Sequence, residues 1–174
     1  MTYQIDPKHS AARFKIRHMM IANVGGEFNS VTGTVDFDPA KPDQSRIEAS
    51  IDVNSLYTGD PQRDGHIKGG DFFDAAQFPA ITFRSAKVAA AGSGYKVAGD
   101  LTLHGVTKPV TLNVDSVSPE ITDPWSGLRR GLTATTTINR KDFGMGWNAP
   151  AGGGVMLSEN VEITLDLEMT RPAA

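Results

Sequence analysis

Apolar and polar residues alternate with a period of two along most of the chain. Phe14 and Ile16 share one parity, whereas Arg13 and Lys15 occupy the other. One face of this extended segment is therefore apolar and the other is charged, as in a half-buried β-strand. The first such stretch covers residues 12–18, and the same alternation recurs in residues 27–37, 47–53, 81–83, 97–103, 110–114, 132–138 and 161–167. The pattern predicts an all-β fold with eight strands.

Turn signals and irregular stretches separate the predicted strands. The turn at residues 104–106 leaves so short a gap that its two flanking strands should form a hairpin. Residues 19–24 and 60–77 lack the alternation, and we expect them to form lids or plugs, with a short helix around residues 63–68. Two further stretches exceed the usual connection of about 4–6 residues and indicate a mouth: residues 116–131 and 144–159.

The charged parity of each strand must face water, so the apolar parities must face one another. A membrane-spanning barrel needs the reverse arrangement, and the sequence therefore favours a soluble barrel or sandwich that does not span a membrane. Eight strands close into a barrel that is either filled by side chains or holds one small ligand. The inner parity mixes small residues such as Ala12, Ala49 and Gly99 with few aromatics, which leaves volume near the axis. The pattern alone leaves a packed core and a ligand cavity as equal alternatives.

Length, charge and the N-terminus narrow the class of protein. We expect one domain over residues 1–174. The balance of 17 Lys and Arg against 20 Asp and Glu lacks the basic footprint of a nucleic-acid binder. The absence of Cys excludes disulfides and thiolate catalysis. The chain as written begins without the features of a signal peptide, so we expect a cytoplasmic protein, or a periplasmic or secreted one if a signal was removed.

The polar candidates for chemistry form no diagnostic motif. The four His residues do not have the spacing of a helical zinc site, and we assign neither metal ligands nor catalytic residues. His18 is the last residue on the apolar face of its strand. Its imidazole therefore either hydrogen-bonds the head group of a ligand or finds its hydrogen-bond partners within the protein at the end of the barrel. The charged stretches 63–64 and 140–142 are either functional or loop anchors. An enzyme acting on a lipid would need an acid/base cluster at the mouth, built from His18, Arg63, Asp64 and His66.

Segments distributed over the whole chain carry a family resemblance. They are Ile5-Asp6-Pro7-Lys8-His9-Ser10, Phe14-Lys15-Ile16-Arg17-His18, Gly26-Glu27-Phe28 with Gly33, Asn54-Ser55-Leu56-Tyr57-Thr58, Arg63-Asp64-Gly65-His66-Ile67, Asp71-Phe72-Phe73-Asp74, Phe78-Pro79-Ala80-Ile81-Thr82-Phe83, Gly99-Asp100-Leu101-Thr102-Leu103-His104-Gly105-Val106-Thr107-Lys108 and Asn139-Arg140-Lys141-Asp142-Phe143-Gly144. In this order and spacing, they resemble the YceI-like, lipocalin-like family of polyisoprenoid-binding proteins.

The resemblance implies a single eight-stranded antiparallel lipocalin-like barrel with one or two short helices. It also implies a homodimer and an elongated apolar pocket for an isoprenoid lipid, such as a polyisoprenoid or an isoprenoid quinone, with no other cofactor. We therefore expect a carrier, storage or sequestering protein rather than an enzyme. The alternatives are an enzyme acting on a similar lipid and a packed barrel that serves as an interaction module.

Strand parity, rather than the resemblance, selects the side chains that we expect to bind the ligand. They are Phe14, Ile16, His18, Phe28, Ile51, Phe83, Leu101, Leu103, Leu112, Ala134, Ile138, Phe143 and Trp147.

Overall fold

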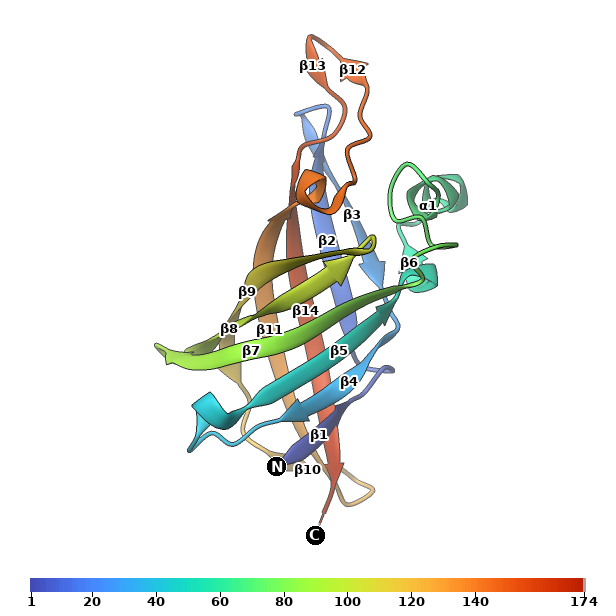
Figure 1. Cartoon of the computed structure of the whole chain (residues 1–174). Helices are drawn as coiled ribbons and strands as arrows, with labels where there is room; N and C mark the ends of the chain where they lie inside the picture. Colours follow the sequence, from blue (N-terminus) through green and yellow to red (C-terminus); the bar gives the residue numbers. More distant parts are fainter. Residues whose placement is uncertain (174) are drawn as a thin grey trace.

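Eight antiparallel strands close into a barrel in the computed structural model, which describes residues 1–173 (Figure 1). In ring order, they are β1 (Thr2–Ile5), β4 (Val31–Asp36), β5 (Arg46–Asp52), β7 (Ala80–Ala91), β8 (Gly94–Leu103), β9 (Val106–Val117), β11 (Gly127–Asn139) and β14 (Asn160–Pro172). β14 pairs with both β1 and β11, and these pairings close the ring. The predicted all-β, eight-stranded barrel is confirmed.

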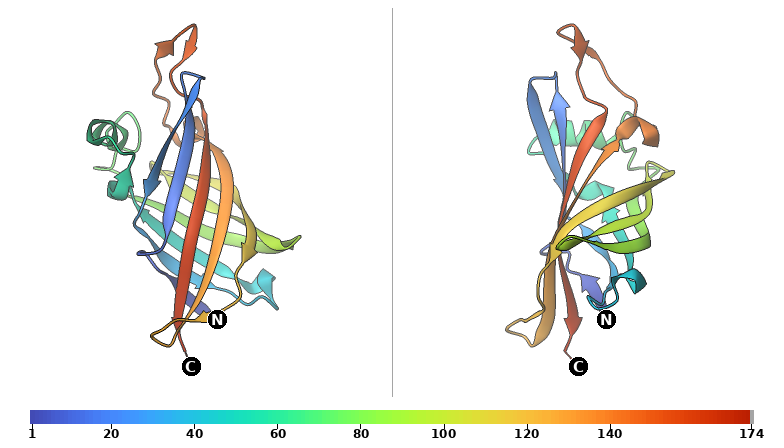
Figure 2. Two further views of the ribbon diagram at one scale, coloured as in Figure 1. Left: turned by 180° about the vertical axis from the view of Figure 1, so that it is seen from behind. Right: turned by 90° about the vertical axis from the view of Figure 1, so that its left-hand side faces the viewer.

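A second group of strands extends the sheet beyond the ring. β2 (Ala11–His18) pairs with the same edge of β14 as β1 does, but nearer the start of β14. Phe14 on β2 lies opposite Ile163, whereas Ile5 on β1 lies opposite Met169. β2 forms a hairpin with β3 (Ala22–Phe28), which in turn pairs with β6 (Leu56–Tyr57). Figure 2 shows this hairpin rising past the barrel at the end opposite the two chain termini.

The remaining elements are short. They are η1 (Pro42–Gln44), η2 (Val53–Ser55), α1 (Pro61–Lys68), β10 (Ile121–Thr122), η3 (Arg140–Phe143), β12 (Pro150–Ala151) and β13 (Gly154–Val155). The carboxylate of Asp60 caps α1 by accepting from the backbone N–H groups of Gln62 and Arg63, and Pro61 occupies the first helical turn. The predicted helix around residues 63–68 is therefore confirmed. Among residues 1–173, no helix has the length and apolar character needed to cross a membrane.

Register places the apolar parities inside the barrel. Ile51 on β5 lies opposite Ile81 on β7, and Phe83 lies opposite Leu101 on β8. The predicted β8–β9 hairpin is also present, with positive φ at both His104 (53°) and Gly105 (70°) in its turn. This two-residue turn matches the right-handed twist of the two strands that it joins.

The membership of the ring differs from the prediction. β1 was not predicted, since four residues are too few for a clear alternation. The predicted strand over residues 27–37 is divided into β3 and β4 at Asn29 and Ser30. The predicted first strand, β2, is not a member of the ring, since it pairs with β14 beyond β1. The count of eight is still correct, because β1 takes its place and β4 supplies the second predicted strand.

The barrel is closed at the end where both termini lie. Tyr3 is fully buried there, and the guanidinium carbons of Arg130 and Arg171 lie 6.0 and 5.6 Å from the centroid of its ring. Arg171 donates two hydrogen bonds of 2.9 Å to Glu120, which also accepts from the Tyr3 hydroxyl. This polar plug lies over a core that includes Met169. An occupant of the barrel therefore has to enter from the opposite end.

Candidate functional site

A cavity of about 470 Å³ lies inside the barrel. Its volume falls in the range of about 300–1,000 Å³ that is typical of small-molecule sites. Aliphatic and aromatic side chains from most ring strands form its wall, as in a site for an apolar ligand.

Most of the side chains selected by strand parity meet around this cavity. Those that line it are Phe14, Ile16, His18, Phe28, Ile51, Phe83, Leu101, Leu103, Leu112, Ile138 and Trp147. They come from seven strands and one loop that are far apart in sequence. Their convergence follows from the alternation of side chains between the two faces of each strand.

Two selected residues lie outside the cavity lining. Ala134 is buried in a separate cluster with Val88, Val97 and Val114, at the point where β11 pairs with β9. Phe143 belongs to η3, where the parity of a strand does not apply, and it is buried in the main core. Its backbone carbonyl accepts a hydrogen bond of 2.9 Å from Nδ1 of His104. Both residues are buried. Strand parity does not give the distance of a buried side chain from the empty volume, and for Phe143 it was the wrong rule.

One small residue has a different role from the one expected. The sequence suggested that Gly99 leaves empty space near the axis, but a Cβ atom there would lie 2.5 Å from Cζ of Phe83. The space beside Gly99 is thus occupied by the Phe83 ring. Ala12 and Ala49 do line the cavity, so small side chains at these two positions leave volume there.

The mouth is built from segments without strand periodicity. Trp147, from the loop between η3 and β12, has its ring centroid 5.1 Å from that of His66 and 5.3 Å from that of Phe72. Met145 and Met156, from the same connection between η3 and β14, also line the cavity. The predicted lid over residues 60–77 and the predicted mouth stretch 144–159 therefore touch each other. Sequence reasoning selected only Trp147 from this group as a ligand-binding residue and named His66 only for the enzyme alternative, because neither segment carries a period that assigns its side chains to a face. The other two predictions of a lid and a mouth are wrong, because residues 116–131 lie at the closed end, where Glu120 joins the plug, and residues 22–24 of the predicted lid 19–24 belong to β3.

Arg140 ties the mouth loop to the barrel. Its side chain is only 2 % exposed, and Nη1 donates to the carbonyls of Met145 and Trp147, each at 2.7 Å. Nε donates to the carbonyl of Ser158 at 2.9 Å. Burial lowers the pKa of Arg140, and the nearby carboxylate of Glu159 opposes that shift. Of the two interpretations of this charged stretch, the contacts support the loop anchor.

The ionisable side chains around the cavity are all basic. They are Arg13, His18, Arg63, His66 and Arg140, and within residues 1–173 no Asp or Glu lines the cavity. Arg63 donates from Nε to Thr58 Oγ1 at 2.8 Å and from Nη2 to the Thr58 carbonyl at 2.7 Å. Asp64 accepts from the backbone N–H of Thr58 at 2.9 Å, away from the lining. The four-residue acid/base cluster required by the enzyme alternative is therefore not assembled around the cavity.

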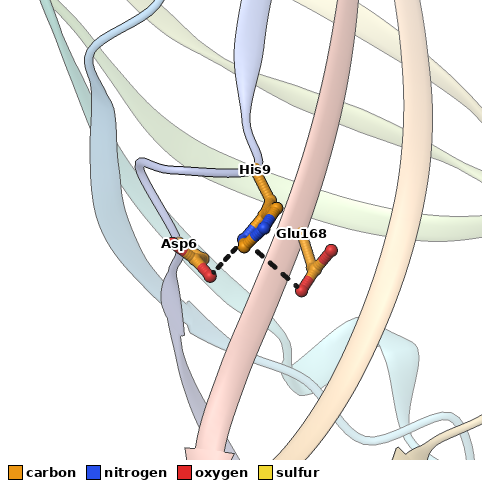
Figure 3. A group of neighbouring side chains, drawn as sticks. All are labelled: Asp6, His9 and Glu168. Atoms are coloured by element: carbon orange, nitrogen blue, oxygen red, sulfur yellow. Dashed lines mark hydrogen bonds and ion pairs between the residues drawn. The ribbon is translucent and has the colours of Figure 1, made fainter. Parts of the chain in front are cut away.

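A different cluster has the composition of a cation site. Figure 3 shows His9 beside the carboxylates of Asp6 and Glu168, with Nδ1 of His9 2.8 Å from Oδ2 of Asp6 and 4.0 Å from Oε1 of Glu168. Nη1 of Arg129 donates to the same two carboxylate oxygens, and its Nε donates to Asp123 at 2.7 Å. Because a guanidinium already supplies the positive charge, we assign the cluster to an ion-pair network.

This network predicts a pH-dependent contribution to stability. Burial raises the pKa of Asp6, but hydrogen bonds from His9, the Lys8 backbone and Arg129 outweigh it and lower that pKa from 3.8 to about 2. The resulting stabilisation, about 2 kcal/mol, is complete above the unfolded-state pKa and is lost as the pH falls through the folded-state pKa. We expect Asp6→Asn to lower the free energy of unfolding at neutral pH, with the difference shrinking from about pH 4 to about pH 2.

Urea denaturation at a series of pH values measures this difference. Asp100→Asn is the control, because Asp100 is exposed on β8 and lies outside the network. A parent and an Asp6→Asn protein with parallel stability profiles over this pH range would contradict the assignment.

Comparison with known proteins places the chain among close relatives. A family model described as the YceI-like domain matches residues 3–169. A UPF0312 protein of Shewanella denitrificans is 40 % identical over 164 residues, which cover 92 % of this chain and 85 % of that protein. A UPF0312 protein of Vibrio cholerae is 39 % identical over 146 residues, covering 82 % and 77 % of the two chains.

Solved structures share the fold. BcnA of Burkholderia cenocepacia superimposes with a TM-score of 0.83 and 28 % identity, covering 94 % of this chain and 98 % of BcnA. A polyisoprenoid binding domain from Saccharophagus degradans, implicated in plant cell wall breakdown, gives a TM-score of 0.67 with 98 % of each chain covered. At 19 % identity, this second likeness establishes the common fold.

Proposed function

Because the chain belongs to the YceI-like family, we propose that it binds an isoprenoid lipid of the polyisoprenoid or isoprenoid quinone type inside the barrel. In this proposal, it acts as a carrier, storage or sequestering protein rather than as an enzyme. The observation that carries the proposal is the apolar cavity, which is closed at the terminal end by the plug around Tyr3. The description of the Saccharophagus degradans domain as polyisoprenoid binding supports the same ligand class.

The energetics of such a site favour a long hydrocarbon chain. Burial of each CH₂ group contributes about 0.8 kcal/mol, so several isoprene units bind tightly without a strong polar contact. Among the basic side chains of the lining, Arg140 keeps one buried donor, Nη2, without a hydrogen-bond partner in the described residues. We expect a head group that accepts hydrogen bonds to lie near this group, at the mouth. The hydrocarbon chain would then extend toward the plug.

Ligand length provides the test of this proposal. Affinity should rise with each isoprene unit that finds apolar surface and should level off once the chain fills the cavity or reaches the mouth. We expect a prenyl alcohol series and a quinone series to reach such a plateau in isothermal titration calorimetry. Fatty acids of matched carbon number should bind more weakly if the cavity is shaped for branched chains.

The same titrations separate the alternatives. Affinity that is independent of chain length would contradict the hypothesis of an elongated pocket. It would favour the packed barrel that acts as an interaction module. Equal affinity for prenyl chains and fatty acids would count against the isoprenoid assignment while preserving an apolar site.

A further inference from the structure

Two hairpin tips project together beyond the barrel at the end away from the termini (Figures 1 and 2). One is the turn between β2 and β3, and the other is the β12–β13 hairpin. The backbone N–H of Met19 donates to the carbonyl of Met156 at 2.7 Å, and His18 forms a β-bridge with Leu157. The two tips are thus joined by backbone contacts.

The joined tips expose large apolar side chains. The exposed fractions are 42 % for Met19, 56 % for Met20, 79 % for Ile21 and 45 % for Val155, and we call these four residues the apolar rim. No Asp, Glu, Lys or Arg occurs in residues 19–26 or in residues 143–158. The outer faces of the barrel strands, in contrast, carry ion pairs such as Arg84 with Glu48.

The backbone of the β2–β3 turn is unfavourable for the residues that occupy it. The His18 carbonyl accepts a hydrogen bond of 3.2 Å from the N–H of Ile21, which closes a β-turn within the three-residue connection between β2 and β3. Its central residues, Met19 and Met20, both have positive φ, at 50° and 61°. Such a turn favours Asn and Gly, whereas a long side chain is strained there. The exposed Met side chains contribute little packing to the barrel, so fold stability does not explain them.

The apolar rim is continuous with the opening of the cavity. His18, Met156 and Leu157, which join the two tips, also line the cavity. Directly behind the rim, Arg17 donates from Nη2 to the carbonyl of Met20 at 2.8 Å. In the described part of the chain, Arg17 has no carboxylate within ion-pair distance. The opening is thus bordered by apolar side chains with an uncompensated positive charge behind them.

We propose that the apolar rim inserts into the surface of an anionic lipid bilayer. Apolar side chains at the tip bury in the acyl boundary, and a basic residue behind them is attracted to anionic head groups. A lipid could then pass between the bilayer and the cavity without exposing its hydrocarbon chain to water. This inference rests on the proposed function, because it assumes that the cavity takes up a membrane lipid.

Flotation with vesicles tests the apolar rim directly. The vesicles contain phosphatidylcholine alone or an equimolar mixture with phosphatidylglycerol. The triple variant Met19→Asn/Met20→Gly/Ile21→Thr removes three rim side chains and introduces the dipeptide that this turn favours. We expect the parent to float with the mixed vesicles and the variant to associate at least about tenfold more weakly. The melting temperature of the variant should stay the same or rise, which separates lost binding from lost folding.

The opposite end of the barrel provides the control. Trp125 is 81 % exposed beside the closed end, and Trp125→Ser should float like the parent. A triple variant that floats like the parent, or a loss confined to Trp125→Ser, would overturn the proposal. So would a parent that floats with neither vesicle type. If the parent floats with neither vesicle type and light scattering detects a dimer that the triple variant loses, the rim belongs to contacts between two copies of the chain.

Lipid content distinguishes failure of this inference from failure of the proposed function. Organic extraction followed by mass spectrometry should find the same lipid in the parent and in the triple variant, because none of the three substituted residues lines the cavity. Retained lipid without flotation of the parent would refute the rim alone. Flotation of a parent that never contains lipid would refute the cavity's function and leave the rim as a membrane-binding surface.

Discussion

Ile51→Lys is expected to abolish either lipid retention or folding. Ile51 lines the cavity from β5, between Val31 on β4 and Ile81 on β7. A lysine ammonium at this position would lose its hydration in an apolar wall, where no carboxylate is present among the described lining residues to pair with it. The effective penalty for such a burial is several kcal/mol, unless the amine deprotonates. Organic extraction with mass spectrometry measures the retained lipid, and thermal unfolding measures stability.

Ser50→Lys is the matched control for this substitution. Ser50 is the neighbouring residue on β5 and lies on the opposite parity, so its side chain belongs to the outer face. The same charge placed there should change neither lipid content nor the melting temperature by much. If Ile51→Lys and Ser50→Lys were indistinguishable in both measurements, the wall at Ile51 would not be an apolar contact for a ligand.

Arg140→Met should release the loop at the mouth and destabilise the protein. The substitution removes hydrogen bonds from one guanidinium to the carbonyls of Met145, Trp147 and Ser158. Hydrogen bonds to a charged group contribute about 1.5–3 kcal/mol each, although water can replace part of them once the loop opens. We expect a loss of about 3 kcal/mol in the free energy of unfolding. Amide hydrogen exchange should accelerate in residues 144–158 before it does so in the barrel strands.

Lys141, the residue next to Arg140, offers the control for the loop anchor. Lys141 is exposed, and its Nζ forms an ion pair of 2.7 Å with Glu159 on the same loop. Because exposed ion pairs contribute about 0–1 kcal/mol, Lys141→Met should have a much smaller effect on stability. Equal losses in the two variants, or exchange in residues 144–158 that does not change in Arg140→Met, would show that Arg140 does not hold the loop.

The strands and their inward faces could be predicted from the sequence because each depends on a local rule. Successive side chains on a strand point to opposite faces, so the parity of Phe14, Ile51 and Leu101 determined which of their faces is apolar. The β8–β9 hairpin was equally local, since Gly105 supports a turn with positive φ. The family resemblance supplied the ligand class, which no strand pattern contains.

Other features depend on segments that only folding brings together. β1 becomes a ring strand because β14 and β4 pair with its two edges, more than 100 residues apart in the case of Ile5 and Met169. Ala134 and Phe143 are buried as expected, but the packing of neighbouring elements places them away from the cavity. No local pattern contains this information.

The sequence by itself determined the strand parities, the hairpin at residues 104–106 and the helix near residues 63–68, because backbone stereochemistry acts over a few residues. The tertiary structure decided where volume stays empty and which polar groups meet. Arg129 reaches Asp6 and Glu168 only because β1 and β11 flank β14. Likewise, the apolar rim exists because the β2–β3 turn lies against the chain near Met156. Contacts of this kind depend on strand pairing between distant segments, and the free energy of that pairing is distributed over the whole sheet.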